Sequence, residues 1–181
     1  MKIDQNKLTY QCKIFSVYEE KVALPDGRSV QQYCIDHKPT VAIVAVNNAN
    51  EVLMIKQYRA AVRQYMLEIP AGTIDGEGES PVVCAQRELA EETGYKAKTL
   101  TKIFEGYLVP GYCNEYMYFF LAKDLYYEPL SADDDEFIDV LPTSFADAKQ
   151  LLKNAEIIDA KTALGLLLAE NYIESMHSLE K

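Results

Sequence analysis

The chain has no tryptophan, only two histidines (His37 and His177) and only four cysteines. The histidines belong to no recognisable motif, and we assign them no role. The cysteines are Cys12, Cys34, Cys84 and Cys113. None forms a C-x-x-C pair, and their spacing is too wide for a zinc knuckle or for the disulfide framework of a small secreted domain. Scattered cysteines of this kind are typical of reduced thiols, so we expect a cytoplasmic protein.

Long hydrophobic runs are also missing. No stretch approaches the length of about 20 apolar residues that a membrane helix needs. The first six residues lack the apolar core of a signal peptide. Positive charge is scarce, because 18 Lys and Arg face 28 Asp and Glu for a net charge of −10. We therefore expect neither nucleic acid nor a membrane as partner, since both would be repelled. The protein can still bind an anionic small molecule despite its negative net charge, if a metal supplies positive charge at the site.

The length of 181 residues, with 49% hydrophobic and 25% charged residues, favours one globular domain. The first third is rich in strand patterns, at 10–18, 30–35, 41–46 and 51–58. The continuous apolar run at 41–46 predicts a strand buried on both faces. A turn at 47–50 then predicts that 51–58 is its hairpin partner.

Helices are predicted in the second half. Ser80 is a good N-cap before Pro81, and Gly94 is suited to end this helix in the left-handed conformation. Two further helices are expected at 145–153 and from Asp159 to about 175. Strands are predicted at 101–107 and 116–122. This order of elements indicates an α+β fold with helices flanking a mixed sheet.

Three glutamates stand out on the helix that begins at Pro81. Glu88, Glu91 and Glu92 are at positions i, i+3 and i+4, which places them within an arc of about 100°. Adjacent carboxylates repel one another unless a cation lies between them, and their oxygens are the ligands that Mg²⁺ and Mn²⁺ prefer. The alternative is a solvated acidic face on an acidic protein. The glycine-rich loop that precedes the helix favours the metal site.

This loop and helix resemble the Nudix box, G-x5-E-x7-R-E-U-x-E-E-x-G-U with U apolar. The matching positions are Glu79, Arg87, Glu88, Leu89, Glu91, Glu92, Gly94 and Tyr95. One position departs from the pattern, because six residues separate Gly72 from Glu79 instead of five. The loop therefore carries a one-residue insertion, which we expect between Gly76 and Gly78.

Within this superfamily the chain is similar to the ADP-ribose pyrophosphatase branch. The similarity includes Gln57-Tyr58-Arg59, the run 67–72 that leads into the box, Pro110 sixteen residues after Gly94, and the segment 158–162. It implies a Nudix-type α/β/α sandwich with a mixed sheet, preceded by an antiparallel β-hairpin. It also implies a β-rich segment at 1–40 beside a Nudix hydrolase domain at 41–181. A homodimer with the N-terminal strands at its interface is the expected assembly.

The resemblance also implies roles for particular residues. Metal ligands are the carboxylates of Glu88, Glu91 and Glu92 with the backbone carbonyl of Ala71, and the metal is Mg²⁺, with Mn²⁺ as an alternative. Catalytic roles fall to Glu136 as general base, to Glu91, and to Arg87 as an anchor of the loop that orients a glutamate. Substrate contacts fall to Arg59, Glu115 and Gly111.

Three of these roles have a plainer alternative, which for Arg87 is an ordinary surface arginine. Glu136 is chosen from the acidic run 133–136 because it adjoins the strand predicted at 137–141, yet a solvated acidic loop has the same pattern. Arg59 suits a phosphate because guanidinium binds phosphate in a forked geometry, yet a charged strand end explains it equally well.

The resemblance implies a Mg²⁺-dependent pyrophosphatase that converts ADP-ribose to AMP and ribose 5-phosphate. GDP-mannose or another nucleotide sugar is the alternative substrate, because Gln31 and Gln32 stand where many relatives carry arginines. A nucleotide sensor without turnover is a further alternative, although it would have no use for three intact carboxylates.

Overall fold

A computed structural model describes residues 7–131 and 137–179 of the chain. The chain divides into two compact units, and each is described by itself. The first consists of Met1–Pro39 with Gly106–Met117, and the second of Thr40–Glu105 with Tyr118–Lys181. The first unit includes 106–117, which the predicted division assigns to 41–181, and the division into a segment at 1–40 and a Nudix hydrolase domain at 41–181 stays a prediction.

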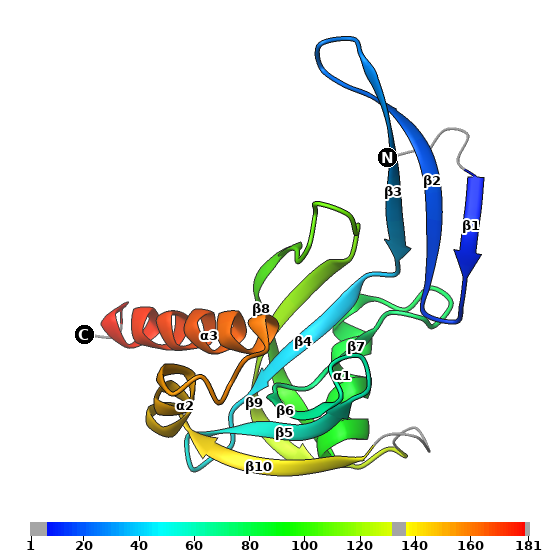
Figure 1. The fold of residues 1–181 in the computed structure, drawn as a ribbon. Coiled ribbons are helices and arrows are strands. Elements are labelled where there is room, and N and C mark those ends of the chain that lie inside the picture. Colours follow the sequence, from blue (N-terminus) through cyan, green and yellow to red (C-terminus); the bar gives the residue numbers. More distant parts are fainter. Residues whose placement is uncertain (1–6, 132–136, 180–181) are drawn as a thin grey trace. The chain divides into compact units, whose positions relative to one another are not determined.

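The first unit is built on three antiparallel strands in the order β1-β2-β3 (Figure 1). They are β1 (Lys7–Gln11), β2 (Phe15–Ala23) and β3 (Ser29–His37). The turn between β2 and β3 is closed by the N–H of Gly27, which donates to Leu24 O at 2.9 Å. The continuous strand predicted at 10–18 is wrong, because the chain reverses at 12–14 and the two halves pair with each other. Aromatic and β-branched residues on both sides of that reversal had concealed it.

The segment 109–114 is tied to the end of β3 by four hydrogen bonds. Ile35 N–H donates to Tyr112 O at 2.8 Å, and Asn114 N–H donates back to Ile35 O at 3.1 Å. The Asn114 side chain accepts from His37 N–H at 2.8 Å and donates to Asp36 Oδ1 at 2.6 Å. These bonds explain why this segment belongs to the first unit.

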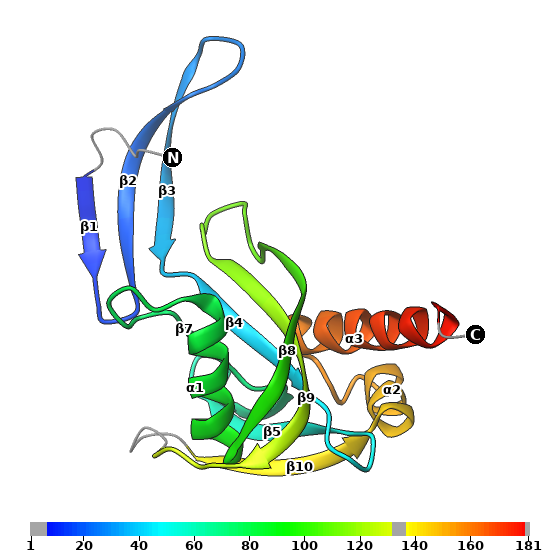
Figure 2. The same ribbon diagram turned by 180° about the vertical axis from the view of Figure 1, so that it is seen from behind.

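The second unit contains a sheet of order β7-β4-β9-β8 and a sheet of order β10-β5-β6. The strands are β4 (Thr40–Ala45), β5 (Glu51–Arg59), β6 (Gln64–Glu68), β7 (Ala71–Thr73), β8 (Tyr95–Tyr107), β9 (Tyr116–Tyr127) and β10 (Ile138–Ser144). The helices are α1 (Pro81–Thr93), α2 (Phe145–Lys153) and α3 (Ala160–Leu179). Helices α1 and α3 lie on opposite faces of the sheet that contains β4 (Figures 1 and 2). The predicted α+β class is confirmed.

Strand β4 is buried along its whole length, as its apolar run predicts. One face, with Val41 and Ile43, packs on Leu89 of α1 in a buried cluster. On the other face Gly165 of α3 approaches Val44, since a Cβ at Gly165 would lie 3.3 Å from Val44 Cγ2. Both faces of the strand are therefore covered by helices.

The hairpin predicted between 41–46 and 51–58 is wrong. The turn forms, with Asn50 N–H donating to Asn47 O at 3.0 Å. However, β5 pairs with β10 and β6 in the other sheet. The predicted segments 41–46 and 51–58 are linked by an isolated bridge between Val46 and Val52. The turn reverses the chain without making the two strands neighbours in one sheet.

The helix ends agree with the predicted signals. The Ser80 side chain accepts from Val83 N–H, and Gly94 has φ 79° with its N–H donating to Ala90 O. Helix α2 has the predicted bounds and is capped by Ser144. The strands predicted at 101–107 and 116–122 are both longer, and β6 was not predicted. Within the described residues, the helices are too short or too polar to cross a bilayer.

Candidate active site

The glycine-rich loop begins on a short strand, β7, which pairs with β4 at the edge of the four-stranded sheet. Beyond β7 the loop closes in an exposed turn, where Glu79 N–H donates to Gly76 O at 3.0 Å. The φ of Gly78 in this turn is 71°, a conformation that favours glycine. The turn occupies the stretch in which we expected the inserted residue.

Two glutamates of α1 lie against the backbone of β7. A Cβ at Gly72 would stand 1.9 Å from the carboxyl carbon of Glu88, so this carboxylate occupies the space that a side chain would fill. The Ala71 N–H donates to Glu92 Oε2 at 3.0 Å, and Glu92 is only 5% exposed. The structure therefore brings Ala71, Glu88 and Glu92 together, as a shared metal site requires.

Arg87 joins the loop to the helix. Its Nε donates to Glu79 Oε1 at 2.9 Å, and its Nη2 donates to Glu79 Oε2 at 3.2 Å. Its Nη1 donates to Glu88 Oε1 at 2.7 Å and to Glu91 Oε2 at 2.9 Å. A further bond from Nη2 reaches the backbone oxygen of Thr73 at 3.1 Å. One guanidinium thus links three carboxylates and the end of β7.

These contacts determine the charge of the site. The hydrogen bond from Arg87 lowers the pKa of the Glu79 carboxyl, and the same bond raises the pKa of Arg87. Burial raises the pKa of the adjacent Cys84 thiol to about 12, with the charges of Glu88 and Glu79 adding to the rise. Arg87 is therefore a permanent cation among carboxylates, and Cys84 is a neutral thiol at ordinary pH.

The residues present suit a hard divalent cation. Three carboxylates and a backbone carbonyl provide the oxygen donors that Mg²⁺ and Mn²⁺ take. The close approach of Glu88 to Gly72 brings one carboxylate to the backbone beside Ala71. Across the described part of the chain, no three His, Cys, Asp or Glu side chains are already gathered in a metal-binding geometry. One oxygen of Glu88 and one oxygen of Glu91 accept from Arg87 Nη1, so this arginine determines the orientation of both carboxylates.

A second charged cluster, which the sequence did not predict, adjoins this site. Glu68 is 1% exposed and receives two bonds from Arg59, from Nε at 2.8 Å and from Nη2 at 2.7 Å. Lys161 also donates to Glu68 and, at 2.8 Å, to Asp159. The fork of Arg59 that we expected to meet a substrate phosphate is thus engaged by Glu68.

Thr162 connects this cluster to the chain before Ala71. Its hydroxyl accepts from Ile69 N–H at 2.9 Å and donates to Asp159 Oδ2 at 2.5 Å. The Asp159 carboxylate also accepts from Thr162 N–H at 2.9 Å, which caps α3. No local signal in the sequence pairs Thr162 with Ile69, because 93 residues separate them.

The other predicted site residues lie elsewhere. Gly111 is exposed and Glu115 is half-buried, and both are in the first unit. Glu136 lies outside the described residues. The roles of these three residues stay predictions.

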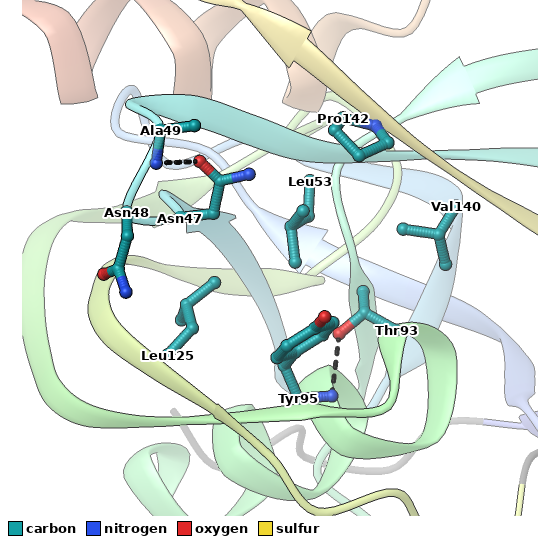
Figure 3. Close-up of a pocket in the computed structure, with 9 residues that line it drawn as sticks. All are labelled: Asn47, Asn48, Ala49, Leu53, Thr93, Tyr95, Leu125, Val140 and Pro142. Carbon is teal, nitrogen blue, oxygen red and sulfur yellow. Dashed lines mark hydrogen bonds between the residues drawn. The ribbon is translucent and has the colours of Figure 1, made fainter.

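A cavity of about 500 Å³ is bordered by Thr93 at the C-terminal end of α1 and by Tyr95 at the start of β8 (Figure 3). Its lining residues are Asn47, Asn48, Ala49, Leu53, Thr93, Tyr95, Leu125, Val140 and Pro142. None of them is a predicted site residue. The Asn47 side chain that borders it accepts bonds from Ala49 N–H and Glu51 N–H, both at 2.9 Å, so this amide oxygen serves the turn.

Comparison with protein families gives one match, in which the model of the NUDIX domain covers residues 36–164. An ADP-ribose pyrophosphatase of Bacillus subtilis (strain 168) is 40% identical over 156 residues, which cover 85% of this chain and 84% of that protein. A methanol dehydrogenase activator of Bacillus methanolicus is 32% identical over 170 residues, which cover 93% of this chain and 89% of that protein.

A GDP-mannose pyrophosphatase of Escherichia coli O139:H28 (strain E24377A / ETEC) is 33% identical over 150 residues, covering 77% of this chain and 75% of that protein. Among solved structures, the crystal structure of an ADP compounds hydrolase matches with a TM-score of 0.85 and 25% sequence identity. The match covers 97% of this chain and 95% of the chain in that structure. The similarity therefore extends over both units.

Proposed function

This chain belongs to the NUDIX domain family, and we propose that it hydrolyses the diphosphate of a nucleoside diphosphate sugar. ADP-ribose is the preferred substrate, and the products are AMP and ribose 5-phosphate. Water adds to one phosphorus of the diphosphate while the bond from that phosphorus to the bridging oxygen breaks. The similarity to an ADP-ribose pyrophosphatase over most of both chains supports this assignment.

The observation that carries the proposal is the placement of two α1 carboxylates on β7. Glu88 lies over Gly72 and Glu92 bonds to Ala71 N–H. A helix whose acidic side chains were merely solvated would not bury Glu92 to 5% exposure against a strand. The loop, strand and helix of the Nudix box form one connected unit through Arg87.

A divalent cation completes this site in our proposal. Glu88, Glu91, Glu92 and the carbonyl of Ala71 would hold Mg²⁺, with Mn²⁺ as the alternative. Bound there, the cation would neutralise charge on the diphosphate oxygens and act as a Lewis acid. This site needs the positive charge of a cation, because its three carboxylates alone would repel the negatively charged diphosphate.

The protein's own groups have separate tasks. Arg87 holds the loop and orients Glu88 and Glu91 through its Nη1. Glu136 is the proposed general base, taking the proton of the attacking water. Arg59, Glu115 and Gly111 are the proposed substrate contacts. Since Glu68 engages Nε and Nη2 of Arg59, a substrate phosphate would have to share this guanidinium with Glu68.

The test measures phosphate release from a panel of nucleotide sugars with Mg²⁺, using alkaline phosphatase to act on the products. Wild type should turn over ADP-ribose, and Glu92→Gln should abolish this. Glu77→Gln is the matched control, since Glu77 is exposed in the loop just before the helix and has no proposed role. No turnover of any nucleotide sugar, with nucleotide binding retained, would favour a sensor and refute the enzyme.

GDP-mannose or another nucleotide sugar is the second candidate substrate. Two points favour keeping it: the similarity to GDP-mannose pyrophosphatases, and Gln31 and Gln32 on β3, where the family resemblance implies arginines. Turnover of GDP-mannose without ADP-ribose would keep the mechanism and change the substrate.

We also propose a cytoplasmic homodimer whose interface includes the N-terminal strands. In the first unit the apolar side chains of Leu8, Tyr10, Ile14 and Tyr33 are 46–60% exposed, and burial against a partner would stabilise them. All four cysteines are free thiols, in keeping with a reducing compartment. Light scattering on the eluted protein tests the assembly, and a monomer mass would refute it.

A further inference from the structure

The connection between β6 and β7 is only two residues long, Ile69 and Pro70, and it passes from one sheet of the second unit to the other. Proline has no N–H, so the amide of Ile69 is the one backbone donor between these strands. The hydroxyl of Thr162, at the start of α3, accepts this N–H at 2.9 Å. Thr162 has no exposed surface, so water does not replace it.

Asp159 determines the direction of that hydroxyl. A threonine hydroxyl has one proton to donate, and here it goes to Asp159 Oδ2 at 2.5 Å. A lone pair of Thr162 Oγ1 is thereby aimed at Ile69. The same carboxylate oxygen accepts from Thr162 N–H at 2.9 Å and from Lys161 Nζ at 2.8 Å, so it is fixed from three sides.

The residues on either side of Ile69 are held as well. Pro70 O accepts from Ile43 N–H of β4 at 2.8 Å, and Ala71 N–H donates to Glu92 at 3.0 Å. Helix α3 also packs closely here, since a Cβ at Gly165 would lie 2.7 Å from Ile69 Cδ1. The chain that leads to the Ala71 carbonyl is thus held by β4, by Glu92 and, through Ile69, by the N-terminus of α3.

We propose that Asp159 and Thr162 are positioning residues for the metal site: through Ile69 they set the orientation of the Ala71 carbonyl. This rests on the proposed function, in which that carbonyl is a metal ligand. Neither residue touches the metal or the substrate in this assignment. Groups that orient metal ligands from outside are worth about 10-fold to 100-fold in metal affinity or activity.

The experiment measures Mn²⁺ binding by electron paramagnetic resonance, without substrate, in wild type and Thr162→Val. Valine has nearly the volume of threonine but cannot accept the Ile69 N–H. We expect Mn²⁺ to bind about 10-fold to 100-fold more weakly, and Thr162→Ser, which keeps the hydroxyl, to restore wild-type affinity. Turnover of ADP-ribose is measured in parallel, with the Mg²⁺ concentration for half-maximal rate rising by a similar factor.

The matched control is Leu166→Ala, a buried position on the same helix that is 3% exposed and makes no polar contact with Ile69. It destabilises the fold without removing the hydrogen bond. The thermal unfolding temperature of each variant shows how much stability it has lost, so that the loss of Mn²⁺ affinity can be compared between variants of similar stability. If Thr162→Val does not fold, Asp159→Ser takes its place, since serine still caps the helix but removes the carboxylate that receives the Thr162 proton.

Unchanged Mn²⁺ affinity in Thr162→Val, equal weakening in Leu166→Ala, or failure of Thr162→Ser to restore affinity would each overturn the inference. If the wild type hydrolyses a nucleotide sugar and binds Mn²⁺, any of these three results refutes the positioning role alone and does not affect the proposed function. A wild type that does neither overturns the proposed function and this inference with it.

Discussion

The carboxylate of Glu88 rests against Gly72, one element away, so closely that a Cβ on this glycine would meet its carboxyl carbon at 1.9 Å and its two oxygens at 2.0 and 2.2 Å. Such distances are far below van der Waals contact. Gly72 therefore leaves the space that the Glu88 carboxylate occupies, and any larger residue there would displace this side chain. The first glycine of the Nudix box and its first helix glutamate are two parts of one contact.

Gly72→Ala should displace Glu88 and lower turnover by about 100-fold, because a misplacement near 1 Å has an effect of this size. The measurement is kcat for ADP-ribose at saturating Mg²⁺. Gly27→Ala is the control, since nothing lies within 4 Å of its Cβ position. That change strains a φ of 84° by about 1 kcal/mol and should leave kcat unchanged. Wild-type activity in Gly72→Ala would refute the contact.

Arg87→Lys should weaken the response to Mg²⁺ even though the charge is kept. One ammonium cannot reach Glu79 on one side and Glu88 and Glu91 on the other, as the guanidinium does. We expect the Mg²⁺ concentration for half-maximal rate to rise by about 10-fold to 100-fold. Arg28→Lys is the matched control, an exposed arginine paired with Asp26. An unaltered Mg²⁺ dependence would show that Arg87 does not orient the glutamates.

The sequence predicted those features that depend on neighbouring residues. Ser80, Pro81 and Gly94 determine the ends of α1 by local hydrogen bonding and backbone conformation, and the predicted bounds are confirmed. The apolar run of β4 predicted burial on both faces, because a strand without polar alternation needs cover on each side. The spacing of Glu88 and Glu92 placed them on one face of the helix, and the structure brings both to β7.

Features that depend on distant partners could not be predicted. Glu68 is the clearest case, because a glutamate between Leu67 and Ile69 gives no sign that it is buried. The two cations that make its burial tolerable, Arg59 and Lys161, are 9 and 93 residues away. The failed hairpin of β4 and β5 has the same origin, since the partner strands of β5 are chosen by packing rather than by the turn before it.

Glu136→Gln tests the general base, whose assignment comes from the sequence. Removing a proton acceptor without removing a substrate contact should lower kcat by about two to four orders of magnitude and leave KM little changed. Asp133→Asn, in the same acidic run, is the control and should have little effect on kcat. An unaltered kcat in Glu136→Gln would place the base elsewhere, with Glu91 as the next candidate.

Glu68→Gln should destabilise the protein by about 3–5 kcal/mol at pH 7, because it removes the one buried carboxylate that faces both Arg59 and Lys161. Burial alone would raise the pKa of Glu68, but the hydrogen bonds from Arg59 and the charge and bond of Lys161 lower it below 4.5, the ordinary value. A lowered pKa means that the folded state favours the charged form, so this stabilisation is complete above about pH 4.5 and is lost as the pH falls through the lower folded value.

The measurement for this substitution is the free energy of unfolding in urea between pH 7 and pH 3, for wild type and Glu68→Gln. The difference between the two proteins should stay constant down to about pH 4.5 and then narrow, because wild-type Glu68 becomes neutral like the glutamine. Glu170→Gln, which removes a pair with the exposed Lys149, serves as the control and should change the free energy little at any pH. A difference that persists undiminished at pH 3 would mean that packing, and not the charge of Glu68, accounts for the loss of stability.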